Sequence, residues 1–255
     1  MATKIKKILV SQPKPENDKS PYLEMAERNN LKIEFRPFIK VEGVSAKEFR
    51  QRRIDLLEHT AVIFTSRTAI DHYFRMAEEL RALIPDSMKY FCLSESIALY
   101  LQKYIVYRKR KIFYGHNVFK DLVEQEVNKH SGEKFLVPMS DQHKPEIPRV
   151  LDRSKINYTK AILYRTVSSD LSDLSNVNYD ILVFYSPSGI KSLFQNFPDF
   201  EQDNTKIACF GPHTARAVKK AGLRLDIEAP TKESPSMTMA LEKFIREFNK
   251  NGCAG

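Results

Sequence analysis

The feature that most constrains this chain is an internal repeat whose period is the size of a domain. The segment Val62–Phe74 matches Leu182–Phe194 at an offset of 120 residues, and Phe91–Ala98 matches Ala208–Ala215 at an offset of 117. Each segment has an apolar strand pattern followed by a hydroxyl residue or a glycine and then the start of a helix. Because repeat arrays have periods of about 20–50 residues, this spacing predicts two similar lobes rather than a solenoid.

Short apolar runs alternate with helical patterns along almost the whole chain. Runs such as Ala61–Thr65 and Asp180–Tyr185 are apolar on both faces, which is typical of strands covered by helices on both sides. Helix starts are marked by Ser20 before Pro21 and by a capping box from Ser45 to Glu48. The helix that starts at Ser45 is expected to end near His59, and a strand is expected over 224–227. The pattern predicts an α/β fold with two similar lobes, each a parallel sheet flanked by helices.

Several classes of protein are excluded by what the sequence lacks. It has no Gly-x-Gly-x-x-Gly or Walker loop, and its three cysteines, Cys92, Cys209 and Cys253, are widely separated. No two histidines are spaced i, i+4, so we expect no metal site. The longest apolar runs are about five residues, and the N-terminus lacks a signal-peptide pattern, so we expect a cytoplasmic protein without a membrane partner.

Lysine and arginine exceed aspartate and glutamate by 41 to 32, a net charge of +9. That excess fits a polyanionic partner and equally fits solubility alone. The turns after the strands are the candidate anion sites, because helix N-termini offer unpaired N–H groups and a positive dipole. The alternative for each turn is ordinary helix capping. The candidate binding residues are Ser11, Thr65, Ser66, Arg67, Ser96, Ser186, Ser188, Gly211 and Thr214.

Four other features have open interpretations. Arg67 could pair with a carboxylate or be simply solvated, and His213 could be an acid–base group or a surface residue. The segment Lys103–Tyr114 mixes basic and aromatic residues, which suits either single-stranded nucleic acid or, as we expect, an amphipathic surface strand. Tyr164 lies within a predicted strand, where tyrosine usually packs.

The same turns resemble the uroporphyrinogen-III synthase family. The resemblance is carried by Asp180–Ile190, by Ile207–Ala217, by Glu228–Met237, by Phe64–Arg67 and by the strand Leu163–Thr166. Members have two α/β lobes joined by a two-stranded β connection. The resemblance implies that 1–36 and 170–255 form lobe one, that 42–160 form lobe two, and that 37–41 and 161–169 are the connecting strands.

The resemblance also implies a reaction. Members cyclise hydroxymethylbilane, a linear tetrapyrrole with four acetate and four propionate arms, to uroporphyrinogen III, with inversion of the last ring and loss of water. Tyr164 matches a tyrosine of the family's cleft and is the expected proton donor to the departing hydroxyl. Ser66, Ser186, Ser188 and Thr214 match positions that line the substrate, and no cofactor is implied.

Several positions depart from the family pattern. Ser94 stands where glycine is usual, Ile97 where threonine is expected, and Gln12 where many members have arginine. The usual glycine and arginine are also missing around Met139–Gln142.

The leading hypothesis is therefore a monomeric, cofactor-independent enzyme whose partner is this polycarboxylate; a nucleic-acid partner is not expected. The alternative is a non-catalytic, two-lobed binding module for an anionic metabolite or nucleic acid, which the altered turn at Ser94 would favour.

Overall fold

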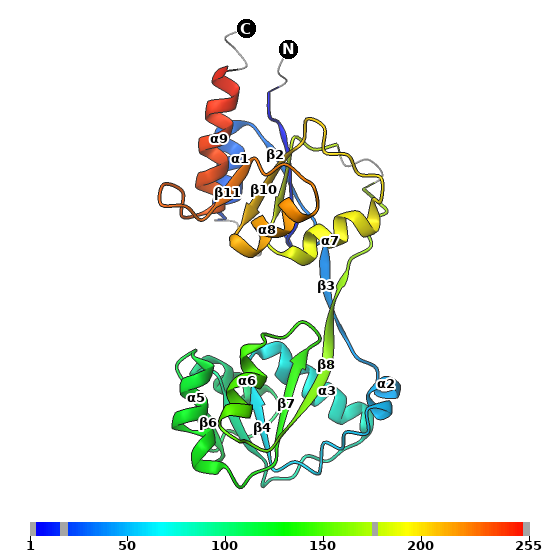
Figure 1. Cartoon of the computed structure of the whole chain (residues 1–255), viewed down its shortest axis with the longest axis vertical. Coiled ribbons are helices and arrows are strands. Elements are labelled where there is room, and N and C mark those ends of the chain that lie inside the picture. The colour runs from blue at the N-terminus through cyan, green and yellow to red at the C-terminus, as the bar shows by residue number, and fades with distance from the viewer. Residues whose placement is uncertain (1–3, 16–19, 175–177, 252–255) are drawn as a thin grey trace. The chain divides into compact units, whose positions relative to one another are not determined.

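The computed structural model describes residues 4–15, 20–174 and 178–251, and the chain divides into two compact units (Figure 1). Unit 1 comprises Met1–Lys40 and Val167–Gly255, and unit 2 comprises Val41–Thr166. Parts of the predicted lobe one, at 1–3, 16–19, 175–177 and 252–255, lie outside the described residues, as does Cys253.

Unit 1 contains a five-stranded sheet in the order β11-β10-β9-β1-β2, and every neighbouring pair in it is parallel. The strands are short and mostly buried, as expected for a sheet covered on both faces. Their bounds are β1 Lys7–Val10, β2 Lys32–Phe35, β9 Ile181–Phe184, β10 Lys206–Phe210 and β11 Ile227–Ala229.

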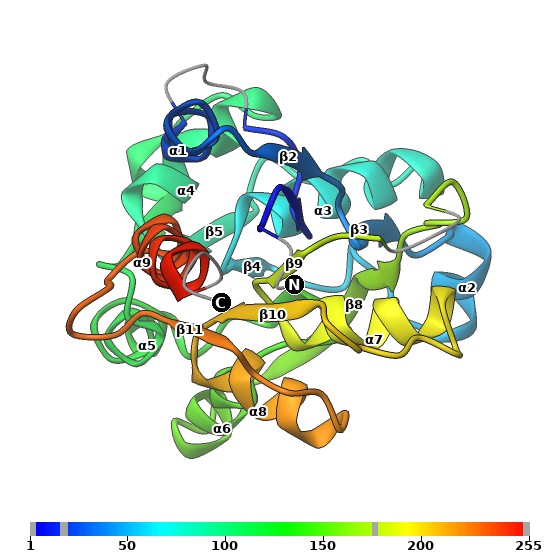
Figure 2. The ribbon, with the colours of Figure 1, turned by 90° about the horizontal axis from the view of Figure 1, so that it is seen from above.

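Helices cover both faces of this sheet (Figure 2). On one face α1 (Pro21–Asn29) and α9 (Met237–Asn251) bury Met25 and Leu241 against the strands. On the other face α7 (Pro187–Asn196) and α8 (Pro212–Lys220) bury Leu193 and Val218. Each face is thus a separate apolar layer, and the predicted α/β class is confirmed for this unit.

Unit 2 contains a six-stranded sheet in the order β3-β8-β7-β4-β5-β6. The five strands from β8 to β6 run parallel, and β3 lies at the edge beside β8. The chain passes from one unit to the other within β3 and again within β8. The bounds are β3 Ile39–Gly43, β4 Ala61–Phe64, β5 Lys89–Cys92, β6 Ile112–Tyr114, β7 Phe135–Ser140 and β8 Tyr158–Ser168.

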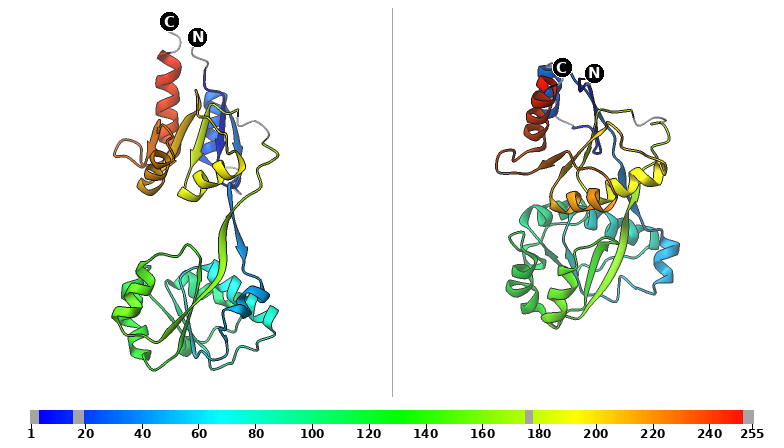
Figure 3. Two further views of the ribbon diagram at one scale, coloured as in Figure 1. Left: turned by 45° about the vertical axis from the view of Figure 1, so that its right-hand side comes forward. Right: turned by 45° about the horizontal axis from the view of Figure 1, so that its top comes forward.

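Helices also cover both faces of the second sheet (Figure 3). One apolar layer involves α2 (Ala46–Gln51), α3 (Arg67–Leu80) and α4 (Glu95–Tyr100), with Phe49, Tyr73 and Ala98 buried in it. The opposite layer involves α5 (Phe119–Gln125) and α6 (Glu146–Arg153), with Leu122 and Leu151 buried. Three short 3₁₀ segments, η1 Leu101–Lys103, η2 Lys109–Lys111 and η3 Val127–His130, complete the unit.

Three predicted elements differ from the structure. The helix expected from Ser45 to near His59 ends at Gln51, and Arg53 has a left-handed φ of 53°, which a continuing helix would not allow. Of the surface strand expected over Lys103–Tyr114, only Ile112–Tyr114 is a strand. The strand expected over 224–227 begins at Ile227 and runs to Ala229.

Within the described ranges, no helix combines the length and the apolar character that crossing a membrane demands. In the same part of the chain, no three His, Cys, Asp or Glu side chains are grouped so that they could hold a metal ion.

Candidate functional site

Each sheet has one place where the chain reverses the direction in which it adds strands. In unit 1 this place lies between β1 and β9, and in unit 2 between β4 and β7. The loops that follow two such strands lead away in opposite directions, so a crevice opens at their carboxyl ends, where ligands bind in open α/β sheets. The residues that leave these strands are Ser11 and Ser186 in unit 1, and Ser66 and Ser140 in unit 2.

In unit 2 a cavity of about 430 Å³ lies at this position. It brings together three residues that the sequence predicted, Thr65, Ser66 and Tyr164, although they come from different strands. Tyr164 reaches it because β8 pairs with β7 and places Tyr164 opposite Ser140. The remaining lining residues are Leu93, Asn117, Val118, Phe119, Met139, Ser140, Gln142, His143, Lys144, Glu146 and Ile147.

The hydroxyl of Ser66 joins a helix start to the predicted catalytic tyrosine. Ser66 is the N-cap of α3, and its Oγ accepts a hydrogen bond from the Ala69 N–H at 3.1 Å. The same Oγ lies 3.4 Å from the Tyr164 hydroxyl oxygen. Because the cap bond uses Ser66 as an acceptor, its own hydrogen is available for Tyr164, which leaves the phenol hydrogen for a ligand.

Burial raises the pKa of Tyr164 above its ordinary value, and the hydrogen bond from Ser66 opposes that rise without cancelling it. The phenol is therefore protonated at neutral pH, as a proton donor must be. Its fixed position beside a cavity is what allows such a group to act on a bound molecule.

Several of the polar residues in this cavity are not predicted from the sequence. Asn117, whose left-handed φ of 67° marks a turn, and His143, whose Nδ1 lies 3.1 Å from the Ser140 carbonyl oxygen, both come from loops. Lys144 is the one lysine or arginine among the lining residues. It lies just beyond Met139–Gln142, where the sequence lacks the family's usual arginine. The missing arginine is the sequence feature that could have directed attention to this nearby lysine.

Two predicted binding residues of unit 2 are not among those that line the cavity. The Arg67 guanidinium carbon lies 5.4 Å from the centroid of the Tyr100 ring. The Ser96 hydroxyl lies 3.1 Å from that of Ser94. Ser94 has an extended φ of −149°, so the position that usually holds glycine requires none here.

In unit 1 the hydroxyls of Ser11 and Ser186 converge on one glycine. Ser186 caps α7, and its Oγ accepts a hydrogen bond from the Gly189 N–H at 3.2 Å. A Cβ atom at Gly189 would lie 3.7 Å from the Ser11 Oγ, 3.8 Å from the Ser186 Oγ and 3.3 Å from the Phe184 ring. The contacts with the two hydroxyls would be ordinary ones, whereas the contact with Phe184 would be tight, so glycine at this position leaves room for the Phe184 ring.

The start of α8 supplies the remaining predicted residues. Gly211 is its N-cap with a φ of 88°, a conformation that favours glycine. Thr214 is only 2% exposed in the first turn of α8, and Ser188 is half-buried in the first turn of α7. Since β9 and β10 are neighbours, the first turns of both helices present N–H groups at one edge of the sheet.

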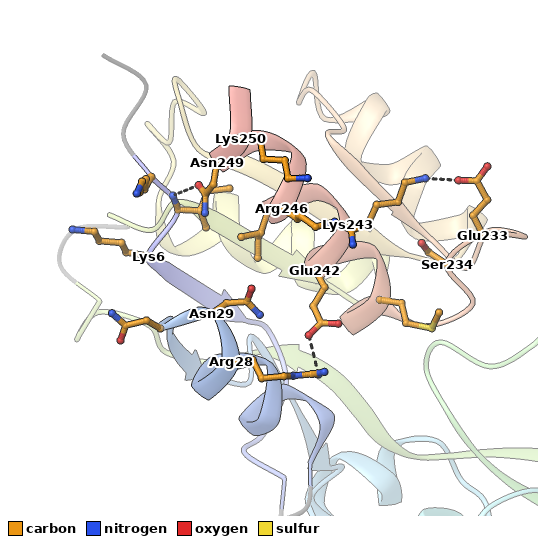
Figure 4. A pocket seen from close by; sticks show the side chains of 15 residues that line it. Lys6, Arg28, Asn29, Glu233, Ser234, Glu242, Lys243, Arg246, Asn249 and Lys250 are labelled. Carbon is orange, nitrogen blue, oxygen red and sulfur yellow. Dashed lines mark hydrogen bonds and ion pairs between the residues drawn. The ribbon is translucent and has the colours of Figure 1, made fainter. Parts of the chain in front are cut away.

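A larger hollow of about 1010 Å³ lies at the opposite, amino edge of β1 (Figure 4). It is lined by α9, the end of α1 and 4–6, and it is rich in cations. Arg28 and Lys250 lie in the last turns of their helices, where cations complement the negative end of the dipole. Arg28 also pairs with Glu242 at 2.8 Å. Because ligands of open α/β sheets bind at the carboxyl ends of the strands and this hollow lies at an amino end, we do not place the functional site there.

Comparison with known proteins assigns the chain to a family. The family model described as "Uroporphyrinogen-III synthase HemD" matches residues 20–239. A uroporphyrinogen-III synthase of Chlorobaculum parvum (strain DSM 263 / NCIMB 8327) is 23% identical over 258 residues, covering 95% of this chain and all of that protein. The crystal structure of uroporphyrinogen-III synthetase from Helicobacter pylori 26695 is similar in fold, with a TM-score of 0.58, 16% identity and coverage of 95% and 100%. The chain belongs to the uroporphyrinogen-III synthase family.

Proposed function

We propose that this protein is a uroporphyrinogen-III synthase that cyclises hydroxymethylbilane, inverts its last ring and releases water. The observation that carries the proposal is the meeting of Ser66 and Tyr164 at a cavity on the switch point of the unit 2 sheet, in a chain that matches this family over 20–239. Membership of an enzyme family does not favour the alternative of a non-catalytic binding module.

The substrate carries eight carboxylates, and both sheets offer groups that bind anions. The first turns of α3, α7 and α8 present backbone N–H groups at carboxyl edges, where the helix dipole is positive. Lys144 adds a full charge at the cavity. Contacts of this kind would hold a flexible chain in one conformation, which is the main requirement for closing it to a single isomer.

Tyr164 supplies the acid. Its hydroxyl donates a proton to the departing hydroxyl of the bilane as the carbon–oxygen bond breaks, and water leaves. The resulting azafulvene-like cation is attacked by the substituted carbon of the last pyrrole ring, which gives a spiro-pyrrolenine. The bond between that carbon and its original bridging methylene then breaks, and this methylene bonds to the free carbon on the other side of the ring nitrogen, so the ring is inverted and the macrocycle is closed. The carbon atom that forms the final bond loses its proton, and that proton restores the phenol. Substrate is thus converted to product and water with no cofactor.

We also propose that the enzyme works as a monomer in the cytoplasm. The described cysteines, Cys92 and Cys209, are buried free thiols, and burial raises the pKa of Cys92 to about 12 and of Cys209 to about 11. Unpaired thiols suit a reducing compartment. Light scattering of the purified protein should give the mass of one chain.

The deciding experiment supplies purified protein with freshly generated hydroxymethylbilane and separates the uroporphyrinogen isomers. We expect mostly type III, because spontaneous closure without inversion gives type I. Type I alone would reject the proposal. A salt-dependent gel shift with short oligonucleotides, together with inactivity on the bilane, would instead support the binding module.

A further inference from the structure

The imidazole of His72 covers one face of the Tyr164 ring. The two ring centroids lie 4.9 Å apart and the planes are inclined by only 15°, which is a stacked arrangement. His72 lies on α3, the helix that Ser66 caps. It is not among the residues that line the cavity, whereas Tyr164 is. His72 therefore contacts the tyrosine ring without itself lining the cavity.

The orientation of His72 is fixed by Arg75, one turn further along α3. The Arg75 Nε–H donates to the His72 Nδ1 at 3.2 Å. The Arg75 guanidinium in turn donates to the Val44 carbonyl oxygen at 2.8 Å and pairs with Glu79. Because Nδ1 accepts a hydrogen bond, the imidazole proton lies on Nε2 and the ring is neutral.

The surroundings of His72 keep it in this neutral form. Burial, followed by the positive charge of Arg75, lowers the pKa of His72, while the charge of Asp71 opposes the change. Protonation would also place a hydrogen on Nδ1 against the Arg75 N–H. A flat, neutral ring of fixed orientation is thus held against Tyr164.

We propose that His72 is a positioning residue, which holds the Tyr164 phenol in the orientation that proton donation requires. The inference rests on the proposed role of Tyr164. Ser66 contacts the hydroxyl of Tyr164, through a long contact of 3.4 Å, and the Tyr164 ring packs against the apolar layer that includes Tyr73. The flat contact with His72 is a further restraint on the orientation of this ring, and small misplacements of a catalytic group are costly to turnover.

A double-mutant cycle between His72→Ala and Tyr164→Phe tests this inference. We expect Tyr164→Phe to lower kcat by about 100-fold with little change in product binding. We expect His72→Ala to lower kcat by about tenfold at nearly constant KM, and to add no loss when Tyr164 is already phenylalanine. Undiminished kcat in His72→Ala, or a loss that persists in the Tyr164→Phe background, would overturn the role of His72 alone.

Two further variants separate positioning from folding. His72→Phe keeps a flat ring and should retain most of the turnover; a loss as large as that of His72→Ala would refute the stacking role. The matched control is His130→Ala, since His130 packs on Phe91 and Phe113 and does not line the cavity. We expect that control to leave kcat unchanged, and an equal loss there would mean that His72→Ala acts through general loosening of the unit.

Nuclear magnetic resonance gives a readout that does not depend on turnover. The ring signals of Tyr164, identified by their disappearance in Tyr164→Phe, should move in His72→Ala because the ring current of His72 is lost. Unmoved signals would overturn the inference. Wild-type turnover in Tyr164→Phe would remove Tyr164 from the acid role and His72 with it, whereas a wild-type protein that yields only type I isomer would reject the proposed function itself.

Discussion

At the scale of single residues, Tyr73 has a buried hydroxyl group that destabilises the folded state. Its side chain is fully buried in the layer that α3 forms on the unit 2 sheet, yet its hydroxyl has no hydrogen-bond partner among the described residues. Burial, followed by the nearby Tyr90, raises the pKa of this phenol, so it stays neutral. A neutral hydroxyl that loses its water contacts without a replacement destabilises the folded state.

We therefore predict that Tyr73→Phe raises the stability of the protein by about 1 kcal/mol, because it removes the unsatisfied hydroxyl and keeps the ring. Thermal unfolding followed by circular dichroism should show a melting temperature about 2 °C higher. Tyr22→Phe is the matched control, since the Tyr22 hydroxyl bonds that of Tyr185 at 2.5 Å and its loss should lower the melting temperature. A lower melting temperature in Tyr73→Phe would contradict the prediction.

At the scale of secondary-structure elements, serine caps combine a structural role with a role in the site. Ser45 and Ser66 each accept an N–H from the first turn of their helix, at 3.2 Å and 3.1 Å. Only Ser66 also contacts Tyr164. We predict that Ser45→Ala and Ser66→Ala each cost about 1 kcal/mol of stability, and that only Ser66→Ala lowers kcat. Chemical denaturation and steady-state kinetics check both; equal kcat values in the two variants would separate Ser66 from catalysis.

The segment that follows β5 is held on α3 by one carboxylate. Asp71 accepts hydrogen bonds from Tyr100, Tyr104 and Lys103. Partial burial alone would raise the pKa of Asp71, but the bonds from Tyr104, Tyr100 and Lys103 together lower it below its ordinary value. The folded state therefore prefers the ionised form, and the resulting stabilisation is present above the unfolded pKa of about 4 and is lost as pH falls through the lower folded value.

It follows that Asp71→Asn should melt at a lower temperature than the wild type at about pH 7, and that the difference should shrink as the pH falls below about 4. Melting curves across that range measure it. Glu146→Gln, a change of the same kind at an exposed residue, provides the comparison. A gap between wild type and Asp71→Asn that widens in acid would contradict the assignment.

Local patterns predicted much of the fold and only part of the site. Ser66 and Ser186 could be found because a serine between an apolar strand and a helix is a recognisable N-cap pattern. His72 could not be found, because nothing in the sequence around a single histidine on an amphipathic helix indicates that it stacks on Tyr164 of a distant strand. Asn117 and Lys144 lie in loops that only the strand order brings together. Arg67 and Ser96 have the right pattern, yet neither lines the cavity.

At the scale of the whole molecule, the two repeated units have similar helix caps at the carboxyl edges of their sheets, but the other side chains at these edges differ. Ser66 and Ser186 occupy equivalent positions, and both cap helices at a switch point. Gly211 and Ser94 are also equivalent, but Gly211 adopts a left-handed φ and Ser94 does not. At the carboxyl edge of its sheet, unit 1 supplies mainly amides and hydroxyls, whereas unit 2 also supplies Tyr164 and Lys144. We infer that unit 1 mainly binds and that unit 2 also carries the acid.

The net charge of +9 acts on the substrate as a property of the whole chain. An octacarboxylate approaching it is attracted over about 30 Å at 0.01 M salt and over only about 8 Å at 0.15 M. We predict that kcat/KM falls over this range through a rise in KM, with kcat constant, because salt screens the encounter and not the proton transfer. Steady-state kinetics against sodium chloride measure this, and an unchanged kcat/KM would contradict it.

Two charge reversals distinguish this general attraction from local contact. Arg246→Glu, on α9, and Lys144→Glu, at the cavity, each change the net charge from +9 to +7. At low salt both should lower kcat/KM, since both weaken the field of the chain. At about 1 M salt, where the Debye length is about 3 Å, only Lys144→Glu should keep a defect, because a direct contact with a carboxylate survives screening that a distant charge does not. Equal behaviour of the two variants at high salt would mean that Lys144 makes no contact of its own with the substrate.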